Sequence, residues 1–329
     1  MMSSNSQPII EVRNLTKHFL TGNALSRRVV RAVQEVSFDL TPGRVVALVG
    51  ESGSGKSTTA RMLARLYEPT SGEILYKGRN TLKDRGRRAM LQYRREVQMI
   101  FQDPFSSLNP VHRIKYHLER PLRIHGKAKR GNIQEQVYAL LDRVALTPVE
   151  EIAEKYPHQL SGGQRQRVAI ARALAVEPEV ILADEPISML DVSIRMGILN
   201  LMAKLRDEQG IAFLYVTHDL ASARYFADET LVMYAGHMVE GAPSEELVTQ
   251  PQHPYTQLLL SACPDPAKGL RTDTTFEARG EVPNLSELGV GCPFAPRCRH
   301  VMPRCSQAMP PVTHLSDTRW TRCFLFNGH

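Results

Sequence analysis

The chain has 329 residues, 42% of them apolar, which exceeds one ordinary core and predicts one large domain with an appendage, or two domains. No stretch approaches the ~18 uninterrupted apolar residues of a membrane helix, and the polar start lacks a signal-peptide segment, so we expect a cytoplasmic protein. The net charge of +7 is uneven, because eight basic residues and one acidic residue lie between Lys77 and Arg95. This run is most simply a solvated face. Anionic lipid or an acidic partner are the alternatives, and no aromatic stacking platform for nucleic acid accompanies it.

Near the start of the chain, Ile9–Val12 and the alternating Glu35–Leu40 predict two antiparallel edge strands. Phe19 lies between them. Taken alone it is more simply a core residue, but the motifs further along the chain make it a candidate to stack on an adenine base.

The segment from Val45 to Thr58 predicts a strand buried on both faces, a glycine-rich turn and a helix. The turn fits the pattern G-x-x-x-x-G-K-[ST], in which backbone N–H groups surround phosphate oxygens at a helix N-terminus. We expect Lys56 to reach the β- and γ-phosphates and Ser57 to bind Mg²⁺. The predicted nucleotide-binding residues are Gly50, Glu51, Ser52, Gly53, Ser54, Gly55, Lys56, Ser57 and Thr58.

Three later apolar segments end in polar residues at Gln102, at Asp184 and Glu185, and at His218. Carboxyl ends of parallel strands share one edge of a sheet, so these side chains should meet beside the phosphate loop. Charges at the end of an apolar strand are costly unless a cation or donor meets them. We therefore expect Asp184 to hold Mg²⁺, Glu185 to orient and deprotonate a water, and His218 to have a catalytic role.

Between about residues 105 and 160, helical periods with charge on one face predict an inserted helical region. A second glycine-containing helix start comes directly after it. Ser161 is a good N-cap, and Gly162, Gly163 and Gln164 permit close backbone approach to an anion. Further on, residues 231–241 predict a hairpin, residues 244–249 and 254–262 predict short helices, and the tail is weakly periodic.

Four of the five cysteines lie in the tail, at Cys292, Cys298, Cys305 and Cys323. Disulfides are disfavoured in the cytoplasm, so clustered thiols suggest thiolate ligation. The gaps of 5, 6 and 17 residues differ from the paired C-x₂-C of common zinc ribbons. The spacing is compatible with an iron–sulfur cluster, with Zn²⁺ or with thiols that bind no metal. Cys263 lies outside this spacing, and we interpret it as an ordinary small apolar residue.

In their order, these motifs resemble those of the ATP-binding subunits of ABC transporters over about residues 9–245. Gly50–Ser57 matches the Walker A loop, Gln102 the Q-loop, Leu160–Gln164 the signature, Val180–Glu185 Walker B, Ser188–Asp191 the D-loop and His218 the H-loop. The implied fold is α/β: a P-loop NTPase (RecA-like) core with an antiparallel β subdomain and an inserted α-helical subdomain in residues 1–245, followed by a small Cys-rich extension at 246–329.

The resemblance also implies hydrolysis of ATP with Mg²⁺ held at Ser57, Gln102 and Asp184. Two such domains pair head to tail, and the Ser161–Gln164 segment of one caps ATP on Lys56 of the other. Glu185 polarises water, His218 contacts the γ-phosphate, and Gln102 links the site to the helical insertion. Met189 departs from the usual alanine of the D-loop, although Asp191 is intact.

Two segments, 101–110 and 253–260, are similar to the dipeptide/oligopeptide importer branch, above all to the "F"-type ATPase of dipeptide permeases. This implies a related "D"-type ATPase as heterodimer partner, two transmembrane permease subunits, an extracytoplasmic substrate-binding protein and a place on the cytoplasmic face of the inner membrane. The cysteines of the extension resemble those associated in this branch with a [4Fe–4S] cluster.

Three other functions differ in how well they fit the sequence. Importers for nickel or glutathione share this architecture, so the transported substrate stays open. A soluble ABC ATPase acting on nucleic acid needs two nucleotide domains or a long coiled coil, and the sequence has neither. An inactive regulatory subunit predicts a degraded Walker B motif or signature, whereas Glu185 and His218 are present.

Overall fold

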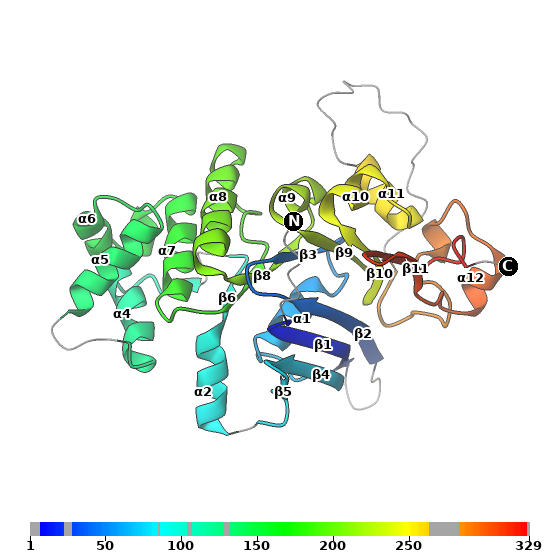
Figure 1. The fold of residues 1–329 in the computed structure, drawn as a ribbon, viewed down its shortest axis with the longest axis horizontal. Coiled ribbons are helices and arrows are strands. Elements are labelled where there is room, and N and C mark those ends of the chain that lie inside the picture. Colours follow the sequence, from blue (N-terminus) through cyan, green and yellow to red (C-terminus); the bar gives the residue numbers. More distant parts are fainter. Residues whose placement is uncertain are drawn as a thin grey trace.

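The computed structural model describes residues 7–22, 28–84, 86–103, 107–127, 132–262 and 283–327. Two sheets organise these residues (Figure 1): an eight-stranded sheet in the order β11-β12-β10-β9-β3-β8-β7-β6, and a four-stranded sheet in the order β2-β1-β4-β5. The larger sheet contains β3 (Val45–Val49), β6 (Val97–Ile100), β7 (Val180–Asp184), β8 (Ala212–Thr217), β9 (Glu229–Tyr234), β10 (His237–Pro243), β11 (Thr313–Ser316) and β12 (Arg319–Thr321).

The centre of the larger sheet is parallel, from β6 through β7, β8 and β3 to β9. Every residue of β3, β7 and β8 is buried. Helices cover both faces of a parallel sheet, so these strands consist of apolar residues without alternation. The predicted buried strands are thereby confirmed, and their carboxyl ends lie at one edge.

The smaller sheet consists of β1 (Ile10–Thr21), β2 (Arg28–Leu40), β4 (Ser71–Tyr76) and β5 (Arg79–Asn80). The prediction that the first strand is an edge strand is wrong, because β1 pairs with both β2 and β4. Both early strands are also longer than predicted. A register shift comes after Val12, and Asn14 has a positive φ of 48°. This irregularity interrupts the two-residue alternation from which strands are predicted.

Helices flank the sheets and form a separate group at one end of the molecule, where α4 (Ile114–Ile124), α5 (Ile133–Arg143) and α6 (Val149–Glu154) lie away from the smaller sheet (Figure 1). Leu118, Val137, Leu141 and Ile152 bury the apolar faces of this group. None of the helices in the described residues is long and apolar enough to cross a membrane. The helices of this group and the core are α1 (Lys56–Leu63), α2 (Arg87–Glu96), α4 (Ile114–Ile124), α5 (Ile133–Arg143), α6 (Val149–Glu154), η1 (Pro157–Gln159), α7 (Gly162–Leu174), α8 (Val192–Gln209) and α9 (Leu220–Phe226).

The basic run contains a helix that the sequence analysis did not predict. In α2, Tyr93 is buried and its hydroxyl donates to the Leu63 carbonyl at 2.6 Å, while Arg87, Arg88 and Arg94 are exposed. Helices are predicted from apolar residues that recur every three to four positions, and Tyr93 is the only buried residue among the arginines of α2. The exposed arginines agree with a solvated face.

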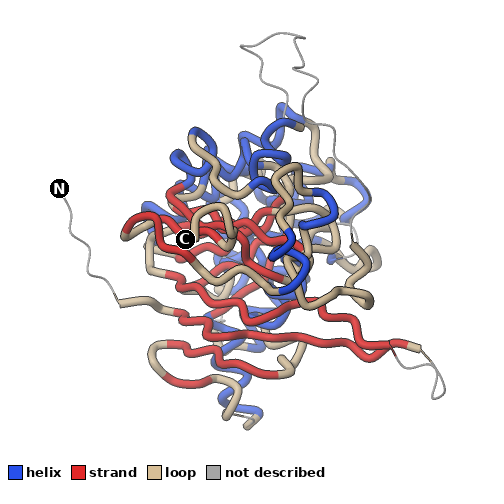
Figure 2. The backbone as a smooth tube through the Cα atoms, turned by 90° about the vertical axis from the view of Figure 1, so that its right-hand side faces the viewer, coloured by secondary structure: helices blue, strands red, loops and turns tan. Residues whose placement is uncertain are grey.

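The last residues of the chain join the core instead of forming a detached tail. Strand β12 pairs with β10 and so belongs to the larger sheet; all strands are drawn in red in Figure 2. A Cβ at Gly241 would lie 2.5 Å from the Trp320 indole nitrogen, so this crossing requires glycine. The two predicted short helices are present as α10 (Ser244–Thr249) and α11 (Pro254–Ser261), and the tail adds η2 (Ala295–Arg297) and α12 (Pro303–Gln307).

His253 fixes the start of α11. Its Nδ1 accepts a hydrogen bond from the Tyr255 N–H at 3.0 Å, and its own N–H donates to the buried Glu240 carboxylate at 2.9 Å. Burial lowers the pKa of His253 to about 3. The ring is therefore neutral in the folded protein at pH 7, which keeps Nδ1 available as an acceptor.

We expect acid to destabilise the protein partly through His253. Between pH 6.5 and 3 the unfolded chain binds this proton and the folded chain does not, so the free energy of unfolding falls as pH drops. Replacing His253 by Asn, which retains an acceptor, should reduce the slope between pH 6 and 4.5 by about 1.4 kcal/mol per pH unit. Urea unfolding at several pH values measures this. The same slope in wild type and variant would contradict it, and replacement of exposed His158 by Asn is the control.

Candidate functional site

The glycine-rich loop connects β3 to α1 and requires its glycines sterically. A Cβ at Gly50 would lie 2.1 Å from the Met233 carbonyl oxygen, and one at Gly55 would lie 2.3 Å from the Ala32 carbonyl oxygen. Ser52 and Gly53 are exposed at the bend of the loop, whereas Ser54 is buried, and Thr58 is partly buried on α1. Neighbouring backbone therefore confines the loop at both ends and leaves its bend open to solvent.

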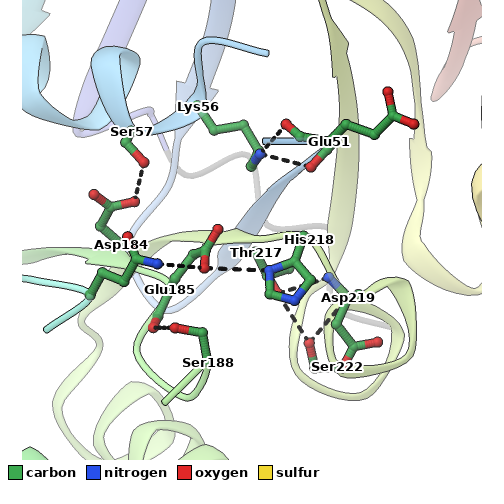
Figure 3. A network of polar contacts seen from close by, with 12 residues as sticks. Glu51, Lys56, Ser57, Asp184, Glu185, Ser188, Thr217, His218, Asp219 and Ser222 are labelled. Atoms are coloured by element: carbon green, nitrogen blue, oxygen red, sulfur yellow. Dashed lines mark hydrogen bonds and ion pairs between the residues drawn. The ribbon is translucent and has the colours of Figure 1, made fainter. Parts of the chain in front are cut away.

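Lys56 lies inside this loop. Its ammonium group donates to the carbonyl oxygens of Gly50 at 2.7 Å and Glu51 at 2.8 Å (Figure 3). Burial lowers the pKa of Lys56, and the nearby carboxylates of Glu185, Asp184 and Glu51 oppose that shift. A cation held in this way offers its charge to an anion that enters the loop.

Ser57 and Asp184 bring hydroxyl and carboxylate oxygens together. The Ser57 hydroxyl donates to Oδ1 of Asp184 at 2.7 Å (Figure 3). Asp184 is completely buried at the end of β7, its Oδ2 has no hydrogen-bond partner, and burial raises its pKa. The Arg61 guanidinium lies 3.9 Å from that oxygen. A buried carboxylate oxygen without a donor, beside a serine hydroxyl, fits a hard divalent cation such as Mg²⁺.

The Glu185 carboxylate contacts Gln102 and His218, the polar residues that follow β6 and β8. Its Oε2 accepts a hydrogen bond from the Gln102 amide at 3.1 Å and lies 3.4 Å from Nδ1 of His218 (Figure 3). Its φ of 46° is in the left-handed region, a strained conformation that is common at functional sites. The structure thus brings together the carboxylate, amide and imidazole that the sequence pattern assigned to one edge.

Two residues next to His218, not predicted as site residues, hold its backbone. Thr217 accepts from the Asp219 N–H at 3.1 Å, and Asp219 accepts from the Ala221 N–H at 2.9 Å as the N-cap of α9. The pattern of a polar residue before an apolar helix could have indicated this cap.

The Ser161 segment forms a capping box at the start of α7. Ser161 accepts from the Gln164 N–H at 3.3 Å, and the Gln164 side chain accepts from the Ser161 N–H at 3.0 Å. A Cβ at Gly163 would lie 2.5 Å from Ile194 of α8. Helix α7 lies beside α8 and away from α1 (Figure 1), so this segment is separate from the Lys56 loop.

The segment at 188–191 joins Glu185 to an exposed apolar surface. The Ser188 hydroxyl donates to the Glu185 carbonyl at 3.0 Å, and Asp191 is exposed at the start of α8. Met189 is 54% exposed and Val192 is 76% exposed. Such exposed apolar residues are typical of a surface that another protein covers.

Phe19 lies on β1 with its ring half-buried, edge-on to Tyr67 at a centroid distance of 5.5 Å. The Lys17 ammonium lies 4.9 Å from the ring centroid. A half-buried ring retains a surface on which a base could stack.

Two residues of the C-terminal part reach the phosphate loop, and the sequence analysis did not identify either. The Tyr255 hydroxyl accepts a hydrogen bond from the Glu51 N–H at 2.8 Å. The Arg297 guanidinium donates two hydrogen bonds to the Glu51 carboxylate, at 2.7 and 2.9 Å. More than 200 residues separate these partners in the chain, so no local pattern links them.

The four tail cysteines are free thiols, and the other three lie near enough to Cys292 to affect its pKa. Cys292 and Cys298 are half-buried, and Cys305 and Cys323 are buried. The N–H of Cys292 donates to the Cys305 carbonyl at 2.7 Å. Burial raises the pKa of Cys292 to about 12, with smaller contributions from the other three thiols. Within the described residues, no group of three or more potential ligand side chains is arranged to hold a metal ion, so the predicted cluster is not confirmed. Cys263 lies outside the described residues.

Together, a buried lysine in a glycine-rich loop, a Ser–Asp oxygen pair and polar strand tips on a parallel sheet define a P-loop nucleoside triphosphatase.

Comparisons with known proteins narrow this class. The family described as "ABC transporter" matches residues 33–188, and "Oligopeptide/dipeptide transporter, C-terminal region" matches residues 239–305. The dipeptide transport ATP-binding protein DppF of Haemophilus influenzae is 40% identical over 96% of both chains. The oligopeptide transport ATP-binding protein OppF of Bacillus subtilis is 48% identical over 79% of this chain and 84% of its own.

Solved structures agree with this similarity. The dimeric structure of MJ0796, a bacterial ABC transporter cassette, has a TM-score of 0.63 and 33% identity, covering 71% of this chain and 98% of that one. The cbiO1 protein of Clostridium perfringens has a TM-score of 0.63 and 27% identity, covering 74% of this chain and 91% of that one. This chain belongs to the ABC transporter family of ATPases, in the group that carries the oligopeptide/dipeptide transporter C-terminal region.

Proposed function

We propose that this chain is the ATP-hydrolysing motor subunit of an ABC importer for dipeptides or oligopeptides. The observation that carries the proposal is its 40% identity to a dipeptide transport ATP-binding protein over 96% of both chains, which spans the nucleotide site and the C-terminal part alike. We assign residues 1–245 to the nucleotide-binding domain, with the helical insertion at about 105–160, and residues 246–329 to the extension.

Within the site, we assign ATP to the loop around Lys56, and Mg²⁺ to Ser57, Gln102 and Asp184. The unpartnered Oδ2 of Asp184 supports this ligand set. When bound, Mg²⁺ neutralises charge on the phosphate oxygens. Glu185 acts as the general base that takes a proton from the attacking water, and His218, 3.4 Å from it, contacts the γ-phosphate.

The ATPase acts as a pair. The Ser161–Gln164 segment caps ATP held by a second ABC subunit, a related "D"-type ATPase, and the 188–191 segment with Met189 lies at that interface. Exposure of Met189, Val192 and Asp191 supports an interface there. The complex includes two transmembrane permease subunits and an extracytoplasmic substrate-binding protein. It holds this chain at the cytoplasmic face of the inner membrane, through contacts of the helical insertion. Phe19 stacks on the adenine.

The four thiols of the extension bind a metal centre, a [4Fe–4S] cluster, with Zn²⁺ as the alternative occupant. The proximity of the other three thiols to Cys292 supports this assignment. Main-chain N–H groups also face three of the sulfurs, from Phe294 to Cys292, from His300 to Cys298 and from Leu325 to Cys323. Such N–H···S contacts stabilise thiolates at metal centres.

Transport is tested with the assembled complex. Expressed with the membrane subunits encoded beside it, the chain should co-purify with two multispanning proteins. Its ATPase rate in proteoliposomes should rise severalfold when a binding protein loaded with a dipeptide is added. Stimulation by nickel- or glutathione-loaded binding protein instead would reassign the substrate, and co-purification with ribosomes or DNA would refute the importer role.

Replacing Glu185 by Gln should keep ATP binding but lower kcat by at least about 10²-fold, because general-base catalysis contributes about 10²–10⁴. The variant should also trap a closed dimer in ATP, seen by size-exclusion chromatography. Lys56→Ala should instead weaken ATP binding itself. Glu179, at the other end of β7, is the matched control, and Glu179→Gln should retain turnover. Parental turnover in Glu185→Gln would show that another group is the base.

Protein purified without oxygen should be brown and contain iron and sulfide in stoichiometric amounts. Replacing Cys305 by Ser should lower the iron content and the visible absorbance together. Colourless protein with one zinc per chain would assign the site to Zn²⁺, and protein without metal would leave the cysteines as free thiols.

A further inference from the structure

Glu51, the second residue of the phosphate loop, is held by the C-terminal part of the chain. Its carboxylate receives two hydrogen bonds from Arg297, and its N–H donates to the Tyr255 hydroxyl at 2.8 Å. Its carbonyl oxygen accepts from the Lys56 ammonium at 2.8 Å. In Figure 3 the Glu51 side chain points away from Lys56, so its main chain and its carboxylate contact different partners.

The groups that hold Glu51 are fixed by packing. The Arg297 side chain is only 6% exposed and its guanidinium lies 5.8 Å from the Tyr234 ring centroid and 5.9 Å from that of Phe294. Tyr255 is completely buried, with its ring centroid 4.4 Å from Tyr234. Buried aromatic residues with few accessible rotamers hold the donor and the acceptor in place, so the contacts with Glu51 are preorganised.

The pairing of Glu51 with Arg297 affects the charge that the phosphate loop presents to ATP. A free carboxylate at the second position of the loop would repel the phosphates of ATP. The two-point pairing with Arg297 cancels that charge in a partly buried setting, where Coulomb interactions are less screened than in water. The positive charge of Lys56 is then left to attract the phosphates. The Tyr255 contact fixes the main chain where the loop leaves β3.

We propose that Arg297 and Tyr255 are positioning residues for ATP, through which the C-terminal extension sets the charge and shape of the phosphate loop and thereby its affinity for nucleotide. The inference rests on the proposed binding of ATP by the Lys56 loop and adds a dependence of that binding on the extension. Arg297 directly precedes Cys298, so the segment that carries the thiols also carries the contact with the loop.

The test measures the Kd of a non-hydrolysable ATP analogue with Mg²⁺ by calorimetry on the full chain. Arg297→Ala should raise the Kd about tenfold, an effect intermediate between exposed and buried charge pairs. The KM for ATP should rise with it while kcat stays within about twofold, because the contact acts on binding. Tyr255→Phe keeps the ring and loses only the hydroxyl, and should raise the Kd severalfold.

A double substitution separates charge from folding. Adding Glu51→Gln to Arg297→Ala removes the uncompensated carboxylate and should restore the Kd to within about threefold of wild type. The matched control is Arg319→Ala, because Arg319 is another arginine of the extension that donates to a carbonyl, that of Gln250 at 2.6 Å, and has no contact with the loop. Its Kd should be unchanged.

Unchanged affinity in both Arg297→Ala and Tyr255→Phe would overturn the inference. A double variant as weak as Arg297→Ala would also overturn it, since that result means Arg297 only maintains the fold. If Arg297→Ala does not fold, the Kd values of Arg297→Lys and Tyr255→Phe are measured in the same assay. Unchanged Kd values in both would overturn the inference. Failure of the wild-type chain to bind the analogue would instead refute the proposed nucleotide site.

Discussion

At the carboxyl edge of the parallel strands, the Lys56 ammonium lies buried near the carboxylates of Asp184 and Glu185, beside the apolar strands β3 and β7. Charge in such a place is costly unless an opposite charge or a hydrogen bond meets it. Loop carbonyls, a serine hydroxyl and the amide of Gln102 supply those partners. Oδ2 of Asp184 has no hydrogen-bond partner, and the Arg61 guanidinium lies 3.9 Å from it.

This constraint explains the arrangement around the site. The central strands β3, β7 and β8 are buried on both faces and largely apolar, so the polar side chains that they contribute to the site lie at their ends. The strand ends then meet at one edge, which brings residues from four parts of the chain within hydrogen-bonding distance of one another. The helical group lies at one end of the molecule (Figure 1), whereas the smaller sheet borders the phosphate loop, because the Ala32 carbonyl of β2 lies against Gly55.

The C-terminal part adds to the core in two ways. Strand β12 extends the large sheet by pairing with β10, and Arg297 with Tyr255 reaches back to Glu51. The hydrogen bonds of Tyr255 and Arg297 with Glu51 therefore join the C-terminal part to the phosphate loop. The extension is thus attached to the nucleotide site itself as well as to β10 of the larger sheet.

By itself, the sequence determined the features that local pattern encodes: buried strands as unbroken apolar runs, the glycine-rich turn before Lys56, polar residues at strand ends, and the capping signal at Ser161. Tertiary structure alone decided that β1 is central, that β12 continues the core sheet, that Tyr93 anchors a basic helix, and that Arg297 pairs with Glu51. The first set arises from periodicity and turn chemistry within a few residues. The second depends on strand pairing and side-chain contacts between residues far apart in the chain, which no short window of sequence contains.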